Sequence, residues 1–149
     1  MNQLAVVPRF TVITLGVSEM RRSIAFYTSL GFARKFRATG EAVAFFDTGG
    51  TVIGLYPWAD LARDAALPDT PRPDGFRGVT LAWNCRSIEE VDAALAFALS
   101  KGASLLKPAD VTDYGGYAGY IADPDGHVWE IVVAPGIEVG DDARVHLPD

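Results

Sequence analysis

The chain has 149 residues, a net charge of −6 and a single cysteine, and this length fits one domain. Its acidic charge argues against nucleic acid as a partner. No apolar run reaches the roughly 20 residues of a membrane span, so we expect a cytoplasmic protein without a membrane partner. The lone Cys85 excludes a disulfide framework within the chain, and a buried, inert thiol is expected there.

The first half of the chain predicts a strand, a helix and three further strands. The β-branched run at 11–14 indicates a strand over residues 9–17. Ser18 is expected to cap a helix that ends at Gly31. The strands that follow are predicted over residues 32–38, 42–47 and 51–56, and a short helical segment over 58–66.

The second half repeats this order after a proline-rich loop, residues 67–75, which we interpret as a linker. A strand is expected over 78–85, and Ser87 with Glu90 forms the capping-box pattern of a helix start. The remaining predicted elements are a helix from 88 to 99 and strands over 104–108, 117–122 and 128–133. The last segment, 136–149, is predicted to be an extended or partly disordered tail.

The last two predicted strands enclose the most informative turn of the chain. Pro124 and Gly126 suit a tight turn, and Asp123 and Asp125 are expected to hydrogen-bond to its backbone. Glu130 is the only charge in the apolar run that follows. A buried charge is costly without a partner, so Glu130 should meet a metal, a cation or a hydrogen-bond donor.

The repeat predicts an α+β fold made of two βαβββ modules, with curved mixed sheets around a cleft. We expect one domain over residues 1–149, with module one at about 8–66, the linker at 67–75, module two at about 76–135 and a tail at 136–149. A single helix covers one face of each sheet, so the other face must be buried against something. Concave clefts between repeated units are frequent ligand sites.

Two motifs resemble the vicinal oxygen chelate superfamily, which includes glyoxalase I, bleomycin-resistance proteins, fosfomycin-resistance enzymes and extradiol dioxygenases. The first runs from Val17 to Tyr27 and continues with Leu30-Gly31-Phe32. The second combines Gly116–Tyr120 with Asp123–Glu130. The resemblance covers residues 9–135 and implies a glyoxalase-like fold, usually in a homodimer. The linker permits pairing of the modules within one chain or their exchange between two chains.

The resemblance also implies where a divalent metal would bind in the enzymes of the superfamily. Its four ligand positions fall on or near Val12, Gly54, Thr80 and Glu130, and only Glu130 carries a good ligand. The two histidines of the chain lie in the predicted turn and in the tail, so they do not supply nitrogen ligands. We therefore expect no metal and no other cofactor.

These observations favour a metal-independent small-molecule binding protein similar to the bleomycin-resistance branch, with an aromatic ligand that is neutral or cationic. The alternative is a metal-dependent lyase, isomerase or dioxygenase with a diverged site around Glu130, which is also the best candidate for a metal-free acid or base. The sequence leaves open whether any reaction is catalysed. The predicted cleft residues are Val12, Thr14, Gly54, Tyr56, Trp58, Thr80, Asn84, Tyr114 and Glu130.

Overall fold

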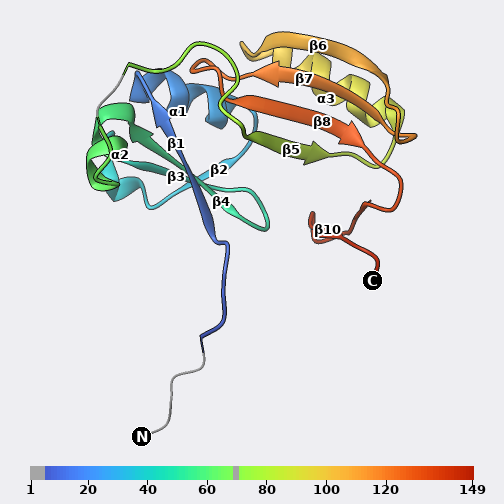
Figure 1. Ribbon diagram of the computed structural model, residues 1–149, viewed down its shortest axis with the longest axis horizontal. Coiled ribbons are helices and arrows are strands. Elements are labelled where there is room, and N and C mark those ends of the chain that lie inside the picture. The colour runs from blue at the N-terminus through green and yellow to red at the C-terminus, as the bar shows by residue number, and fades with distance from the viewer. Residues whose placement is uncertain (1–5, 69–70) are drawn as a thin grey trace, which may run out of the picture.

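The computed structural model describes residues 6–68 and 71–149, and it confirms the α+β fold with two modules. Each module holds one four-stranded mixed sheet, with strand orders β1-β4-β3-β2 and β5-β8-β7-β6 (Figure 1). The first and last strands of each module run parallel, and the other pairs are antiparallel. Within the described ranges, no helix is long and apolar enough to cross a membrane.

Module one follows the predicted order with shorter strands. Its elements are β1 (Val12–Val17), α1 (Met20–Ser29), β2 (Ala33–Lys35), the 3-10 helix η1 (Arg37–Thr39), β3 (Ala44–Asp47), β4 (Val52–Pro57) and α2 (Trp58–Asp64). The strand predicted over 32–38 stops early because Phe36 adopts a left-handed backbone with φ of 49° and leads into η1. Residues 6–11, expected in part to extend β1, form an arm that leaves the body of the molecule (Figure 1).

Module two contains β5 (Thr80–Asn84), α3 (Ile88–Ser100), β6 (Ser104–Val111), β7 (Tyr117–Ala122) and β8 (Val128–Val133). The β7–β8 hairpin has the predicted bounds. Strand β6 extends beyond the predicted 104–108 because its end, Val111, still pairs with Tyr117, after register shifts on either side of Lys107.

Of the two predicted helix caps, the one on α3 is confirmed and the one on α1 is not. Ser87 caps α3 as predicted, since its hydroxyl oxygen accepts a hydrogen bond of 3.1 Å from the backbone N–H of Glu90. The Glu90 carboxylate reaches back to the backbone N–H of Arg86, at 2.6 Å. The predicted cap at Ser18 is wrong: Glu19 is the N-cap of α1 and makes no side-chain capping bond. Ser18 instead donates its hydroxyl to Asp125.

The tail contains a small hairpin, so it is more ordered than the sequence suggested. Its strands are β9 (Glu138–Val139) and β10 (Val145–His146), which pair antiparallel. Arg86 donates hydrogen bonds of 3.3 and 2.9 Å to the carbonyl oxygens of Val139 and Gly140. These bonds attach the hairpin to the start of α3.

The modules meet through their helix-covered sides. The Trp129 ring of β8 lies 6.1 Å from the ring of Tyr27 on α1 and 6.0 Å from that of Phe32, measured between centroids. Its indole N–H also donates to the Tyr27 hydroxyl at 3.2 Å. This contact joins both modules into one hydrophobic core. The opposite face of each sheet carries no helix over most of its area.

The reactivity of the Cys85 thiol reports on whether this core is closed. Its side chain is buried, and desolvation together with the charge of Glu90 raises the pKa of the thiol to about 11. We expect the folded protein not to react with a thiol reagent at pH 8, whereas protein unfolded in guanidinium reacts fully. Rapid labelling of the folded protein would show that this part of the core opens readily.

Candidate functional site

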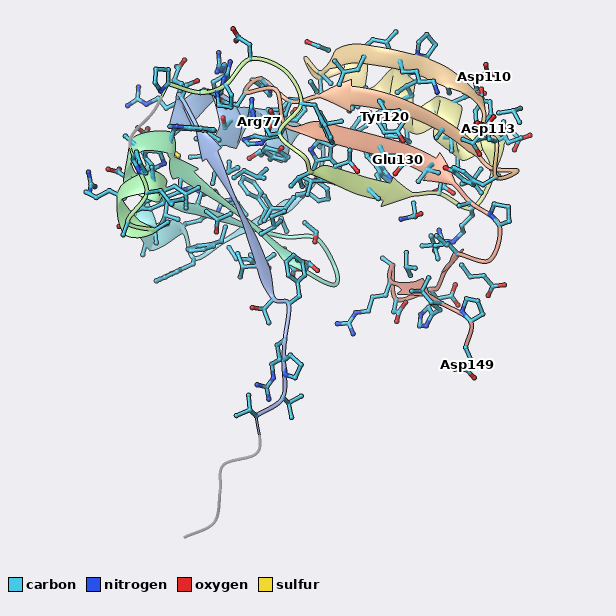
Figure 2. All side chains as sticks on the ribbon, viewed as in Figure 1. Arg77, Asp110, Asp113, Tyr120, Glu130 and Asp149 are labelled. Atoms are coloured by element: carbon cyan, nitrogen blue, oxygen red, sulfur yellow. The ribbon has the colours of Figure 1, made fainter. Side chains whose placement is uncertain are left out.

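Glu130 lies on the helix-free face of module two and is hydrogen-bonded to a tyrosine. In the register of the sheet, Glu130 stands between Ala82 on β5 and Tyr120 on β7 (Figure 2). The Tyr120 hydroxyl donates to the Oε1 atom of Glu130 at 2.9 Å. Burial, this hydrogen bond and the Glu130 charge raise the pKa of Tyr120 to about 12, so the phenol stays a neutral donor. The partner that Glu130 requires is thus a side chain of its own hairpin.

A groove of about 630 Å³ lies beside this pair, between the sheet and residues 72–77, which we call the strap. Its walls include the side chains of Phe76 and Leu106, together with Val128 and Tyr120 of the sheet. Thr80, from the predicted cleft set, also lines it. Module two therefore presents a mainly apolar depression next to a half-buried carboxylate, the combination typical of small-molecule sites.

Both ends of the strap are fastened to the turn between β7 and β8. Arg72 donates to the carbonyl oxygen and to the Oδ1 atom of Asp125, at 2.7 and 3.1 Å. Arg77 donates to the same carbonyl oxygen and, at 3.3 Å, to a ring nitrogen of His127. The Arg77 guanidinium also lies 5.5 Å from the centre of the Trp58 ring. Burial and the neighbouring charge of Arg72 lower the pKa of Arg77.

Asp125 joins the two modules instead of closing its own turn, which corrects the expectation from the sequence. Its side chain is fully buried, and its Oδ1 atom accepts from the backbone N–H and the hydroxyl of Ser18 at 2.8 and 2.7 Å. Its Oδ2 atom accepts from Ser23 at 2.9 Å. Burial alone would raise the pKa of Asp125, but the bonds from Ser18 and Ser23 and the charge of Arg22 outweigh it, so the pKa is lowered.

Asp123 does fasten the turn, as predicted. Its Oδ1 atom accepts from the backbone N–H groups of Asp125 and His127, both at 2.9 Å. Its Oδ2 atom accepts from the Tyr27 hydroxyl at 2.7 Å, and burial together with this carboxylate raises the pKa of Tyr27. His127 contacts the carbonyl oxygen of Gly16 at 2.7 Å through Nε2. That contact requires the proton on Nε2, so Nε2 serves the junction between the modules, whereas Nδ1 accepts from Arg77 of the strap.

The helix-free face of module one holds other members of the predicted cleft set. A Cβ atom on Gly54 would lie 3.1 Å from the Thr14 hydroxyl oxygen and 3.6 Å from a methyl group of Val12, so these three residues are neighbours. Helix α2 covers the far end of this face, where Trp58 packs against Gly16. Tyr56 is hydrogen-bonded to Asp64 of α2. This bond is the main cause that raises the pKa of the Tyr56 phenol, and burial is the second.

Within one chain, the predicted cleft residues are divided between these two faces. The groove and a second pocket of about 900 Å³ both include Thr80, and the second pocket also includes Asn84. That second pocket follows the free edges of β1 and β5 and includes Ile13 and Ile53 from the helix-covered side. Neither pocket contains Val12, Thr14, Gly54, Tyr56, Trp58, Tyr114 or Glu130.

The residues on these faces do not fit a resident transition metal. In the part of the chain that the structure describes, no three His, Cys, Asp or Glu side chains converge as a metal site requires. The neighbours of Glu130 in the sheet are Ala82 and Tyr120, which add at most a phenol oxygen.

The predicted cleft set lacks Tyr120 and the whole strap. Tyr120 was detectable, because a turn centred on residues 123–127 puts Ala122 opposite Val128 and therefore Tyr120 opposite Glu130. Arg72 and Arg77 carried no comparable signal, since their partner Asp125 lies 53 and 48 residues further along the chain.

The fold and the site define a protein of two βαβββ modules with a helix-free, partly apolar sheet face. The model of the Glyoxalase/Bleomycin resistance protein/Dioxygenase superfamily matches residues 9–131, and the chain belongs to this superfamily. The resemblance seen in the two sequence motifs is thereby confirmed. Comparison with curated proteins finds no match.

Solved structures support this assignment. A glyoxalase-related enzyme from Fulvimarina pelagi is 34% identical, with a TM-score of 0.83 over 96% of this chain and 100% of that one. A glyoxalase/bleomycin resistance protein/dioxygenase family enzyme from Burkholderia phytofirmans PsJN is 22% identical, with a TM-score of 0.75 over 85% and 99%. Lactoylglutathione lyase from Agrobacterium tumefaciens is 18% identical, with a TM-score of 0.62 over 84% and 92%. The last two show similarity of fold alone.

Proposed function

We propose that the protein binds a small molecule in the manner of the glyoxalase/bleomycin-resistance type, as a cytoplasmic homodimer and without a catalytic metal. The observation that carries this proposal is the Glu130–Tyr120 pair beside the apolar groove. One carboxylate oxygen is held by the phenol, which leaves the other to receive a donor from a ligand. An acidic chain with one free cysteine suits the cytoplasm.

The proposed ligand is aromatic and carries no net negative charge. Phe76 and Tyr120 offer ring surfaces in the groove, and aromatic rings pack favourably against one another. The carboxylate of Glu130 favours a ligand with a hydrogen-bond donor or a positive charge.

The two helix-free faces support the proposed homodimer. On module one, Val12 is 41% exposed, and Phe36, which stacks on Phe45 at 6.2 Å, is 68% exposed. A sheet face with such side chains is normally covered by another layer. In the proposed dimer, module one of one copy covers module two of its partner, which would bring Thr14 and Gly54 opposite Glu130 and complete the cleft.

A ligand screen tests the binding function. We expect some aromatic, neutral or cationic compounds to raise the melting temperature, since a ligand at 100 times its Kd stabilises the folded state by about 2.7 kcal/mol. Calorimetry should give one site per chain, and Glu130→Gln should weaken binding about tenfold or more. Glu138→Gln, which removes an exposed carboxylate of the tail, is the matched control. Stoichiometric binding by none of the compounds, with turnover of one of them, would refute the proposal.

The second candidate is a metal-dependent lyase, isomerase or dioxygenase with Glu130 as a ligand. It is favoured by the description of the 34% identical Fulvimarina pelagi protein as a glyoxalase-related enzyme. Metal analysis of the purified chain, with and without added manganese, iron, zinc or nickel, separates the two candidates. One bound metal per chain that is lost in Glu130→Gln would support the enzyme. Substoichiometric metal under every condition would support the binding protein.

A further inference from the structure

Two charges of opposite sign lie on the helix-free face of module two without an oppositely charged partner in the described ranges. Lys107 on β6 is in register with Tyr120 on β7, which is in register with Glu130 on β8. Neither Lys107 nor Glu130 forms a salt bridge with any residue in the described ranges. Neighbouring strands are about 4.8 Å apart, so the two backbones are separated by roughly 10 Å.

A second separation of charge runs along the strands of module two. Figure 2 shows Arg77 toward the junction of the modules, Tyr120 and Glu130 in the middle of the sheet, and Asp110 with Asp113 at its far end. The groove occupies the basic side, where Arg72, Arg77 and Lys107 line it with one acid, Asp74. Basic groups thus gather at the strap end of module two, and two acids lie at its other end, although the chain as a whole has a net charge of −6.

Between the charged positions the surface is apolar. Phe76, Leu106 and Val128 line the groove, and Tyr120 stands between Lys107 and Glu130. A ligand with one positive charge would leave Lys107 unpaired next to an apolar body, and a ligand with one negative charge would leave Glu130 unpaired. Such unpaired charges are unfavourable wherever the ligand excludes water.

We propose that this face binds an amphoteric molecule with an aromatic or apolar body, a cationic group at Glu130 and an anionic group at Lys107 and the strap. This inference rests on the proposed binding function and specifies its ligand class as net neutral with separated charges. The spacing of the strands suits charges at opposite ends of about one aromatic ring. The phenol of Tyr120 lies beneath that ring.

Three matched probes test the inference by calorimetry on the full chain: 4-(aminomethyl)benzoate, 4-methylbenzylamine and 4-methylbenzoate. The first carries both charges, and each of the others carries one. We expect the first to bind about tenfold more tightly than either single-charge probe, which corresponds to one charge-assisted hydrogen bond. Lys107→Met should remove this advantage over the amine. Glu130→Gln should remove the advantage over the benzoate.

Lys101→Met is the control, because Lys101 follows α3 on the opposite side of the sheet. Thermal unfolding of each variant checks that the fold is retained. Equal binding of the amine and the amphoteric probe, with no effect of Lys107→Met, would overturn the inference and leave the proposed binding function intact. Absence of binding by all three probes, when the screen finds another ligand, would overturn it as well. A screen without any ligand would instead count against the proposed function itself.

Discussion

Replacing Asp125 by alanine is expected to lower the free energy of unfolding by about 3–5 kcal/mol, the usual effect of removing one partner from a buried charged network. The carboxylate is fully buried and accepts hydrogen bonds from Ser18 and Ser23 of module one and from Arg72 of the strap. Without it, the buried hydroxyl of Ser23 loses its acceptor, and Ser18 and Arg72 lose theirs at the edge of the site. Urea denaturation at pH 7 measures the effect.

Asp141→Ala, at an exposed position in the tail, is the control and should change stability by less than about 0.5 kcal/mol. Asp125→Asn keeps the shape of the side chain and should be intermediate. Because the pKa of Asp125 is lowered in the folded state, the ionised carboxylate contributes stability above about pH 4. That contribution is lost as the pH falls through the folded-state pKa. Stability of Asp125→Ala should therefore fall less steeply in acid than that of the native chain, and an equal slope would contradict this role.

The fold could be predicted largely because its signals are local. The β7–β8 hairpin has the predicted bounds, since alternating β-branched and aromatic residues surround a turn with Pro124 and Gly126. The α3 cap was predictable for the same reason, because Ser87 and Glu90 are three residues apart. Prediction failed where a distant partner decides the outcome. Ser18 resembles a helix cap, but it is used by a carboxylate 107 residues away.

The candidate site was harder to predict for a geometric reason. Alternation along a strand gives the face on which a side chain lies. The family resemblance grouped Val12 with Gly54 and Thr80 with Glu130, and each pair does lie on one sheet face. Alternation gives no information on whether two faces turn toward each other. In one chain they do not share a pocket, because the modules meet through the rings of Tyr27 and Trp129. In the proposed dimer, the distance between the open faces would depend on how the two copies pack, which the sequence pattern does not encode.

Substitution of Ala82 by glutamate is expected to raise the dissociation constant of the proposed dimer at least about 100-fold. Ala82 is exposed in the single chain and pairs with Glu130 in the sheet, so the new carboxylate would lie beside an existing one. If a second copy covers this face, two like charges must lose water together, which costs several kcal/mol. Sedimentation should give twice the chain mass of 16.0 kDa for the native protein and the monomer mass for Ala82→Glu.

Ala25→Glu gives the comparison that makes this result specific. Ala25 is also exposed, but it lies on α1 and therefore away from the helix-free sheet faces. The same added charge there should leave the dimer unchanged. Loss of the dimer in both variants would indicate a general effect of charge. A native chain that sediments as a monomer would refute the homodimer directly. If Ala82→Glu remains dimeric, the copies do not meet through the helix-free face of module two.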